Sequence, residues 1–181
     1  MKNLSRRVRV ATGAAALAVA GAAAFGTASA NASAPAASPA VSVAPGATTA
    51  STHLTVDAAT RAAQAALDAA EAENQRVTVA VVDRNGNTVV TLRGDGAGPQ
   101  SYESAERKAF TAVSWNAPTS ELAGRLAQTP NLKDIPGTLF LAGGVPVTAH
   151  NAPIAGIGVA GAPSGAADEK YARAGAAALG R

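Results

Sequence analysis

The chain of 181 residues contains no cysteine, and aromatic residues make up only 3% of it. Without cysteine the protein has no disulfides, thiolate metal centres, iron–sulfur clusters or cysteine nucleophile. Site chemistry is therefore limited to histidine, carboxylate and hydroxyl groups. The few aromatic side chains supply little large apolar surface, so we expect a homo-oligomer that buries more apolar area.

Positive charge is concentrated at the N-terminus, where the first nine residues hold one lysine and three arginines. An uncharged stretch rich in Ala, Val, Leu and Gly follows over residues 11–24, and Ala28-Ser29-Ala30 has the small residues of a cleavage site. We predict a signal peptide over residues 1–30. Because Arg6 and Arg7 are adjacent, the twin-arginine type is favoured over a general secretory signal. The protein is therefore expected to be secreted.

Removal of this leader changes the charge balance of the chain. It leaves 11 Lys and Arg against 12 Asp and Glu, a net charge of −1 in place of +3. The basic character that would favour nucleic acid binding is then absent, so no nucleic acid partner is predicted. Residues 31–52 are rich in Ala and Pro and uncharged up to Ser51, which is typical of a linker. The folded domain is predicted over residues 53–181.

Hydrophobic periodicity, turn residues and caps predict nine elements in this domain. Helices are expected at residues 55–74, 101–117, 119–127 and 165–180. Strands are expected at residues 77–82, 88–92, 138–142, 145–148 and 154–160. Asn85-Gly86 and Gly143-Gly144 are predicted hairpin turns. Strands joined by such short turns are antiparallel, so the prediction is a profilin-like α+β domain whose five-stranded antiparallel sheet is flanked by helices.

One motif resembles a cofactor fingerprint without its structural setting. Gly156-Ile157-Gly158-Val159-Ala160-Gly161 fits G-x-G-x-x-G, but it lies within a predicted strand instead of between a strand and a helix. We interpret these glycines as allowing close backbone packing. The turn at residues 161–165 precedes a helix, and that helix terminus offers a weaker site for a carboxylate or phosphate.

Other catalytic arrangements have little support. His53 and His150 are the only histidines, and nothing in the sequence indicates that they meet in a metal site. No G-x-S-x-G elbow is present, so a hydrolase is not predicted.

Two pairs of carboxylates have a spacing that suits a hard cation. Asp68 and Glu71 are three residues apart on one predicted helix, and Glu103 and Glu106 are three apart on another. Residues at this spacing share a helix face, so each pair can present oxygen atoms to an iron ion. The alternative is a purely structural role, because Glu103 can also pair with Arg107 and acidic residues stabilise the first turn of a helix.

Five short motifs of the domain form a recognisable set: Glu106-Arg107-Lys108-Ala109-Phe110-Thr111-Ala112, Pro136-Gly137, Gly143-Gly144-Val145-Pro146-Val147, Ile157-Gly158-Val159-Ala160-Gly161-Ala162 and Asp168-Glu169. Over residues 54–181 this set resembles the GlcG/HbpS family of haem-binding and haem-degrading domains. The leader and linker make the chain similar to its secreted actinobacterial members. The resemblance implies a homo-octamer that binds haem and iron and interacts outside the cytoplasm with a membrane sensor histidine kinase under redox stress.

The resemblance also implies site residues. Thr111 stands where the family offers a threonine to haem iron, and Lys108 and Phe110 are nearby candidates for haem contact. The pairs Asp68/Glu71 and Glu103/Glu106 stand where acidic motifs are linked to iron. A threonine hydroxyl is a weak ligand compared with His, Cys, Met or Tyr, so haem would be held mainly by other contacts. His53 and His150 are rival ligands, ranked lower.

Two classes of function follow from this comparison. The first is a secreted haem- and iron-binding protein that buffers haem and reports redox stress, with slow haem degradation as an open possibility. The second is an enzyme or enzyme-accessory domain that binds another small ligand. Because metabolism of small organic acids is cytoplasmic, the export signal favours binding over catalysis.

Overall fold

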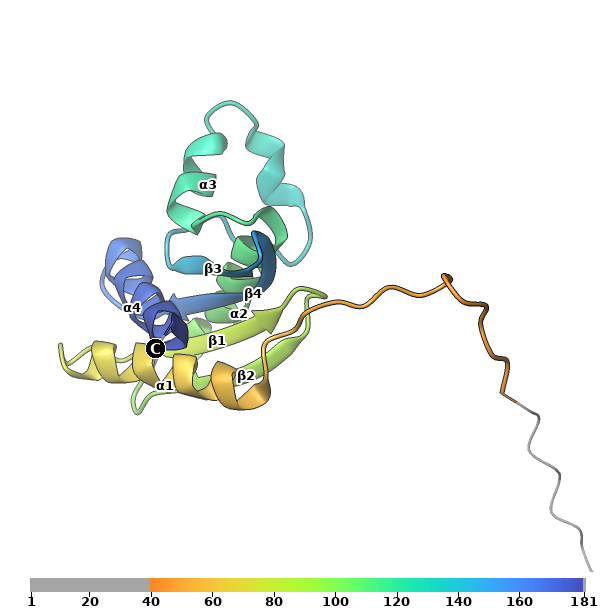
Figure 1. The fold of residues 1–181 in the computed structure, drawn as a ribbon. Coiled ribbons are helices and arrows are strands. Elements are labelled where there is room, and N and C mark those ends of the chain that lie inside the picture. Colours follow the sequence, from red (N-terminus) through yellow and green to blue (C-terminus); the bar gives the residue numbers. More distant parts are fainter. Residues whose placement is uncertain (1–39, 181) are drawn as a thin grey trace, which may run out of the picture. The chain divides into compact units, whose positions relative to one another are not determined.

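The computed structural model describes residues 40–180. Contacts divide the chain into two units, Met1–Pro45 and Gly46–Arg181, and every described helix and strand lies in the second. The predicted leader and residues 31–39 of the predicted linker lie outside the described residues. The elements follow in the order α1 (Val56–Glu71), β1 (Thr78–Asp83), β2 (Thr88–Arg93), α2 (Pro99–Trp115), α3 (Thr119–Arg125), the 3-10 helix η1 (Pro130–Asp134), β3 (Gly144–Ala149), β4 (Ala152–Ala160), α4 (Gly165–Ala177) and the 3-10 helix η2 (Ala178–Gly180) (Figure 1).

The strands form one antiparallel sheet in the order β2-β1-β4-β3. The predicted turn between β1 and β2 is confirmed: Gly86 has a φ of +86°, which glycine adopts without steric cost. The Asp83 carboxylate fixes this turn by accepting hydrogen bonds from the backbone N–H groups of Asn85 and Asn87 at 2.8 and 2.9 Å. A second tight turn, at His150 and Asn151, joins β3 to β4.

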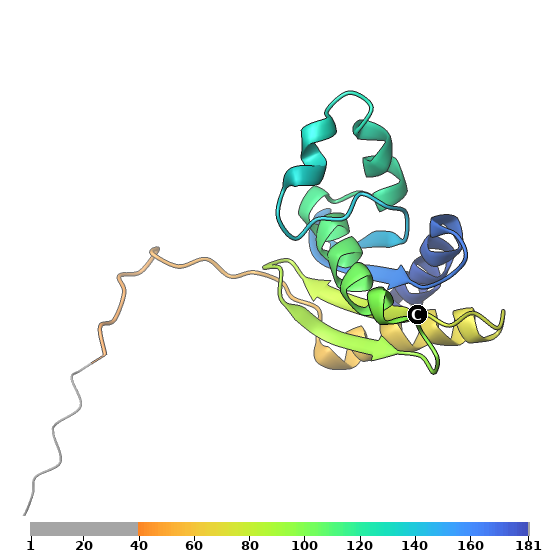
Figure 2. The ribbon, with the colours of Figure 1, turned by 180° about the vertical axis from the view of Figure 1, so that it is seen from behind.

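The two faces of the sheet carry different helices. Alternate residues of β1 point to opposite faces, and Val77, Val79 and Val81 pack with α1 and α4 in the main core. The intervening residues Ala80 and Val82 pack against α2 on the other face. Figure 1 shows α1 and α4 in front of the sheet, and Figure 2 shows α2 in front when the molecule is turned round. No helix among residues 40–180 has both the length and the apolar character needed to cross a bilayer.

The predicted strand at residues 138–142 is wrong, and the sheet has four strands instead of five. The pattern of Thr, Leu and Phe in this segment favours a strand, but its groups are paired elsewhere. The Leu139 N–H donates to the Thr111 hydroxyl on α2 at 2.8 Å, and the Thr138 hydroxyl donates to the Ile135 carbonyl at 2.8 Å. Phe140 packs in a small separate cluster that contains Leu122. Gly143-Gly144 is therefore the entry into β3 and not a hairpin turn.

Glycines set the distance between α2 and the sheet. A Cβ atom on Gly156 would lie 2.1 Å from the Ala109 carbonyl oxygen, and one on Gly158 would lie 2.1 Å from the Ala105 carbonyl oxygen. Real Cβ atoms do not approach this closely, so the helix rests directly on the backbone of β4. The G-x-G-x-x-G motif lies mostly within β4, as predicted, and its glycines serve helix packing.

Candidate functional site

Phe110 forms the centre of a cleft on the face of the sheet covered by α2. Its ring lies between two turns: a Cβ on Gly86 would be 2.9 Å from one ring edge, and a Cβ on Gly137 would be 3.6 Å from the other. Both glycines have positive φ, +86° and +78°. The cleft measures about 290 Å³. It is lined by Val82, Gly86, Thr88, Glu106, Arg107, Phe110 and Gly137.

Charged groups of α2 line the same cleft. The Glu106 carboxylate accepts a hydrogen bond from the Thr91 hydroxyl at 3.2 Å. The Arg107 guanidinium forms an ion pair with Glu103 at 2.5 Å, as the sequence spacing predicted, and both side chains are largely exposed. An exposed ion pair exchanges partners at little cost. The cleft thus combines an aromatic ring with a cation that can donate hydrogen bonds to a carboxylate of a ligand.

Thr111 lies next to this cleft but is covered. Its side chain is 0% exposed. The hydroxyl donates to the Arg107 carbonyl at 2.7 Å and accepts from the Leu139 N–H at 2.8 Å. Only one lone pair of the oxygen is free of hydrogen bonds. Ligation of iron by Thr111 stays a prediction, and it requires that the atoms covering the hydroxyl move aside.

Lys108 is directed away from the cleft, into the interior. Its Nζ atom lies 2.7 Å from the Asp168 carboxylate, and the two side chains are only 6% and 5% exposed. Nζ also donates to the Val159 carbonyl at 3.0 Å, and the Ala162 N–H donates to the other Asp168 oxygen at 3.0 Å. Burial raises the pKa of Asp168, while the hydrogen bond and charge of Lys108 act in the opposite direction. A haem contact by Lys108 stays a prediction that would require this pair to open.

The buried pair also bears on the weaker anion site predicted after Gly161. The Asp168 carboxylate itself accepts the Ala162 N–H in this turn, and the Ser164 hydroxyl accepts the Ala167 N–H at the start of α4 at 3.2 Å. Groups of the protein thus already pair with these donors.

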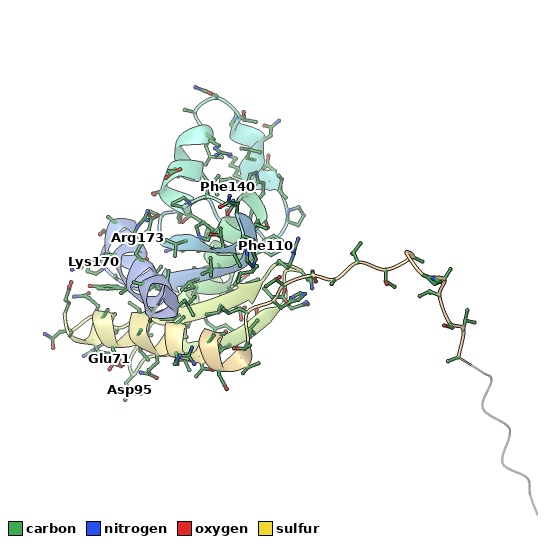
Figure 3. All side chains as sticks on the ribbon, viewed as in Figure 1. Glu71, Asp95, Phe110, Phe140, Lys170 and Arg173 are labelled. Carbon is green, nitrogen blue, oxygen red and sulfur yellow. The ribbon has the colours of Figure 1, made fainter. Side chains whose placement is uncertain are left out.

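The two acidic pairs predicted for iron lie on opposite faces of the sheet, because α1 and α2 cover different faces. Asp68 is exposed and accepts a hydrogen bond from the Gln64 amide at 2.6 Å. Glu71 lines a separate pocket of about 380 Å³ together with Asp95 and Arg76 (Figure 3). Among residues 40–180, no three His, Cys, Asp or Glu side chains gather at a spacing that would hold a metal ion. Iron binding by these residues stays a prediction.

The two histidines are exposed and belong to different segments. His53 precedes α1 and hydrogen-bonds to the Ser51 hydroxyl at 2.7 Å. His150 occupies the β3–β4 turn with a φ of +51°. Neither lines the cleft at Phe110.

A further pocket of about 460 Å³ lies where α3 and α4 meet, with Lys170 and Arg173 on its rim (Figure 3). Its buried acid is Glu169, which accepts hydrogen bonds from the Ser120 N–H at 3.1 Å and the Ser120 hydroxyl at 2.9 Å. Arg173 also pairs with Glu169 at 2.6 Å, and Lys170 pairs with Glu73. These contacts hold α4 against α3 and α1.

Residue patterns alone did not identify the walls of the cleft. Gly86 was predicted only as a turn residue, and Gly137 only as part of a loop. Their φ values explain why glycine is needed, but their contact with Phe110 depends on the packing of α2, which no local pattern encodes.

Comparisons with known proteins point to one family. Residues 54–177 match the family model described as "Haem degrading protein HbpS-like". The crystal structure of a double mutant of HbpS from Streptomyces reticuli is 76% identical, with a TM-score of 0.79 over 81% of this chain and 100% of that chain. A second crystal structure of HbpS is 77% identical, with a TM-score of 0.77 over 78% of this chain and 100% of that chain. The crystal structure of a PduOC:heme complex is 26% identical, with a TM-score of 0.65 over 70% of this chain and 95% of that chain. A comparison with curated protein sequences found no match.

Proposed function

The chain belongs to the HbpS-like family of haem degrading proteins, and from this premise we propose that it binds haem at the cleft around Phe110. One observation carries the proposal: an aromatic ring is fixed between two glycine turns beside an exposed guanidinium. The ring offers apolar contact to a porphyrin edge, and the guanidinium suits a propionate. The PduOC:heme complex, a structural relative, adds support for haem as the ligand.

The residues present fit haem in the chemistry of their side chains. Phe110 would supply apolar contact, and Arg107 would exchange Glu103 for a propionate group. Thr111 would supply a weak axial oxygen ligand once uncovered. The cleft volume of about 290 Å³ lies at the small end of ligand sites, so one chain would enclose only part of the macrocycle. Haem iron, when bound, supplies redox chemistry, and these side chains hold and orient it.

A haem titration of the purified protein, followed through the Soret band, tests this site. Phe110→Ala should weaken haem affinity about threefold to tenfold, because ring contact is lost. Arg107→Gln should weaken it about twofold to fivefold, as expected for an exposed ion pair. Arg125→Gln removes an exposed cation on α3 and is the matched control. Equal affinity of the Phe110 variant and the unmodified protein would refute the site.

We further propose that the protein is secreted, assembles as an octamer and reports redox stress to a membrane sensor histidine kinase. The support is the leader-like sequence over residues 1–30 and the membership of the family. Cell fractionation would test export, and light scattering after size-exclusion chromatography would give the oligomer mass. Recovery of the full-length chain only in the cytoplasm would refute the secreted function.

Slow haem degradation is a second candidate, favoured by the description of the family as haem degrading. Iron released in this way would meet exposed carboxylates, and we propose Asp68, Glu71, Glu103 and Glu106 as its ligands. Incubation of the haem complex with ascorbate should then bleach the Soret band and release iron that Glu103→Gln/Glu106→Gln retains less well. A stable Soret band would leave binding as the function.

A further inference from the structure

A short segment without helix or strand, residues 138–142, crosses α2 beside the cleft; we refer to it as the strap. It links the region after η1 to β3. Glycines with positive φ stand at both ends, Gly137 at +78° and Gly143 at +131°. Such residues are common points of chain reversal, where large backbone rotations meet little steric resistance. The strap therefore begins and ends at conformationally permissive positions.

One hydrogen bond joins the backbone of the strap to α2. The Leu139 N–H donates to the Thr111 hydroxyl at 2.8 Å, and that hydroxyl is 0% exposed. The same hydroxyl gives its proton to the Arg107 carbonyl. An incoming metal centre would compete with Leu139 for the lone pairs of this oxygen, and it would also need the space above it.

Side-chain packing holds the strap only in its middle. Phe140 is buried beside Leu122, and its ring meets Trp115 edge-on with centroids 5.3 Å apart. The next residue, Leu141, is 57% exposed, and Ile135 before the strap is 40% exposed. A movement of the strap would thus alter an apolar part of the surface.

We propose that ligation of haem iron by Thr111 releases the Leu139 amide and opens the strap, so that the ligand state of the site changes the surface around Leu141. This inference rests on the proposed haem site and on Thr111 as its ligand. It gives the site a physical means of signalling occupancy: one oxygen atom either pairs with the strap or binds the metal.

Amide hydrogen exchange of the strap, measured with and without haem, tests the proposal. In the free protein the Leu139 amide should be protected, and haem should speed its exchange about fivefold, roughly the value of one net hydrogen bond. Thr111→Val should show the fast exchange already without haem, and haem should change it no further. Thr111→Ser keeps the hydroxyl and should behave like the unmodified protein.

Ser114→Ala is the matched control, because the Ser114 hydroxyl makes an equivalent bond to the Phe110 carbonyl on α2 at 2.7 Å without contacting the strap. Its Leu139 amide should exchange as in the unmodified protein. A Soret shift on haem binding together with unchanged or slower exchange at Leu139 would overturn the strap proposal and leave the haem site intact. Absence of any Soret shift would overturn both proposals.

Discussion

Replacing Gly158 by alanine would insert a methyl group between α2 and β4. The added Cβ would lie 2.1 Å from the Ala105 carbonyl oxygen and 2.5 Å from the Ala109 nitrogen. Both neighbours are backbone atoms of a helix, so no side-chain rotation relieves the clash. Ordinary contact begins at 3.4 Å, so the separation must grow from 2.1 to 3.4 Å, a displacement of about 1.3 Å.

A displacement of this size loosens an entire layer of packing. The residues between α2 and the sheet are small, such as Ala80 and Ala105, and they are fully buried. A radial gap of about 0.5–1 Å already forfeits a quarter to a half of each dispersion contact. Overpacking typically costs about 1–3 kcal/mol, and this site should lie at the upper end because its neighbours are rigid. We therefore expect the free energy of unfolding to fall by about 3 kcal/mol.

Urea denaturation at fixed protein concentration measures this loss. For an m-value of about 2 kcal/mol per molar urea, the midpoint should fall by about 1.5 M. Gly124→Ala is the control, because a Cβ at Gly124, within α3, meets nothing within 4 Å. Alanine should stabilise that helix by up to about 1 kcal/mol. Equal midpoints for Gly158→Ala and the unmodified protein would show that α2 does not rest on the glycines of β4.

Two further predictions concern charged groups. Lys108→Met should lower the free energy of unfolding by about 3–5 kcal/mol, because it leaves the buried Asp168 carboxylate without its partner. Thermal unfolding should show most of this loss recovered in Lys108→Met/Asp168→Leu, and failure to recover would mean that the pair itself is stabilising. Burial acts to raise the pKa of Asp83, but the N–H groups of its turn outweigh burial and lower it. Its stabilising contribution is therefore present above the unfolded pKa of about 3.9 and lost as pH falls through the lower folded value, so the destabilisation by Asp83→Asn at pH 7 should shrink below about pH 4.

Local sequence signals predicted the parts of the fold that depend on neighbours in the chain. Thr55 caps α1 by accepting the Ala58 N–H, and the Asn85-Gly86 turn joins β1 and β2, as predicted. The segment at residues 138–142 has equally strong local signals for a strand, yet its amide at Leu139 pairs with Thr111, 28 positions earlier in the chain. Strand propensity describes a preference for a half-buried pleated surface, and tertiary contacts override it here.

The candidate site shows the same division. The spacing of Glu103 and Arg107 predicted their ion pair, because residues four apart meet on a helix. Lys108 and Asp168 are 60 positions apart, and no spacing rule indicates that they meet in the interior. The family resemblance pointed to α2, but the contact of Phe110 with its two glycine walls emerged only from the packing.

The packing of α2 links stability to ligand affinity in a way that two variants can separate. Cβ atoms at Gly156 and Gly158 would each approach a carbonyl oxygen of α2 to 2.1 Å, so both alanine variants should lose similar stability. Gly156 meets Ala109, the residue before Phe110, whereas Gly158 meets Ala105, one turn away. Gly156→Ala should therefore displace Phe110 from the cleft more and weaken haem binding more. Equal haem affinities at equal loss of stability would mean that the position of Phe110 is set by the turns around it and not by the height of α2 above the sheet.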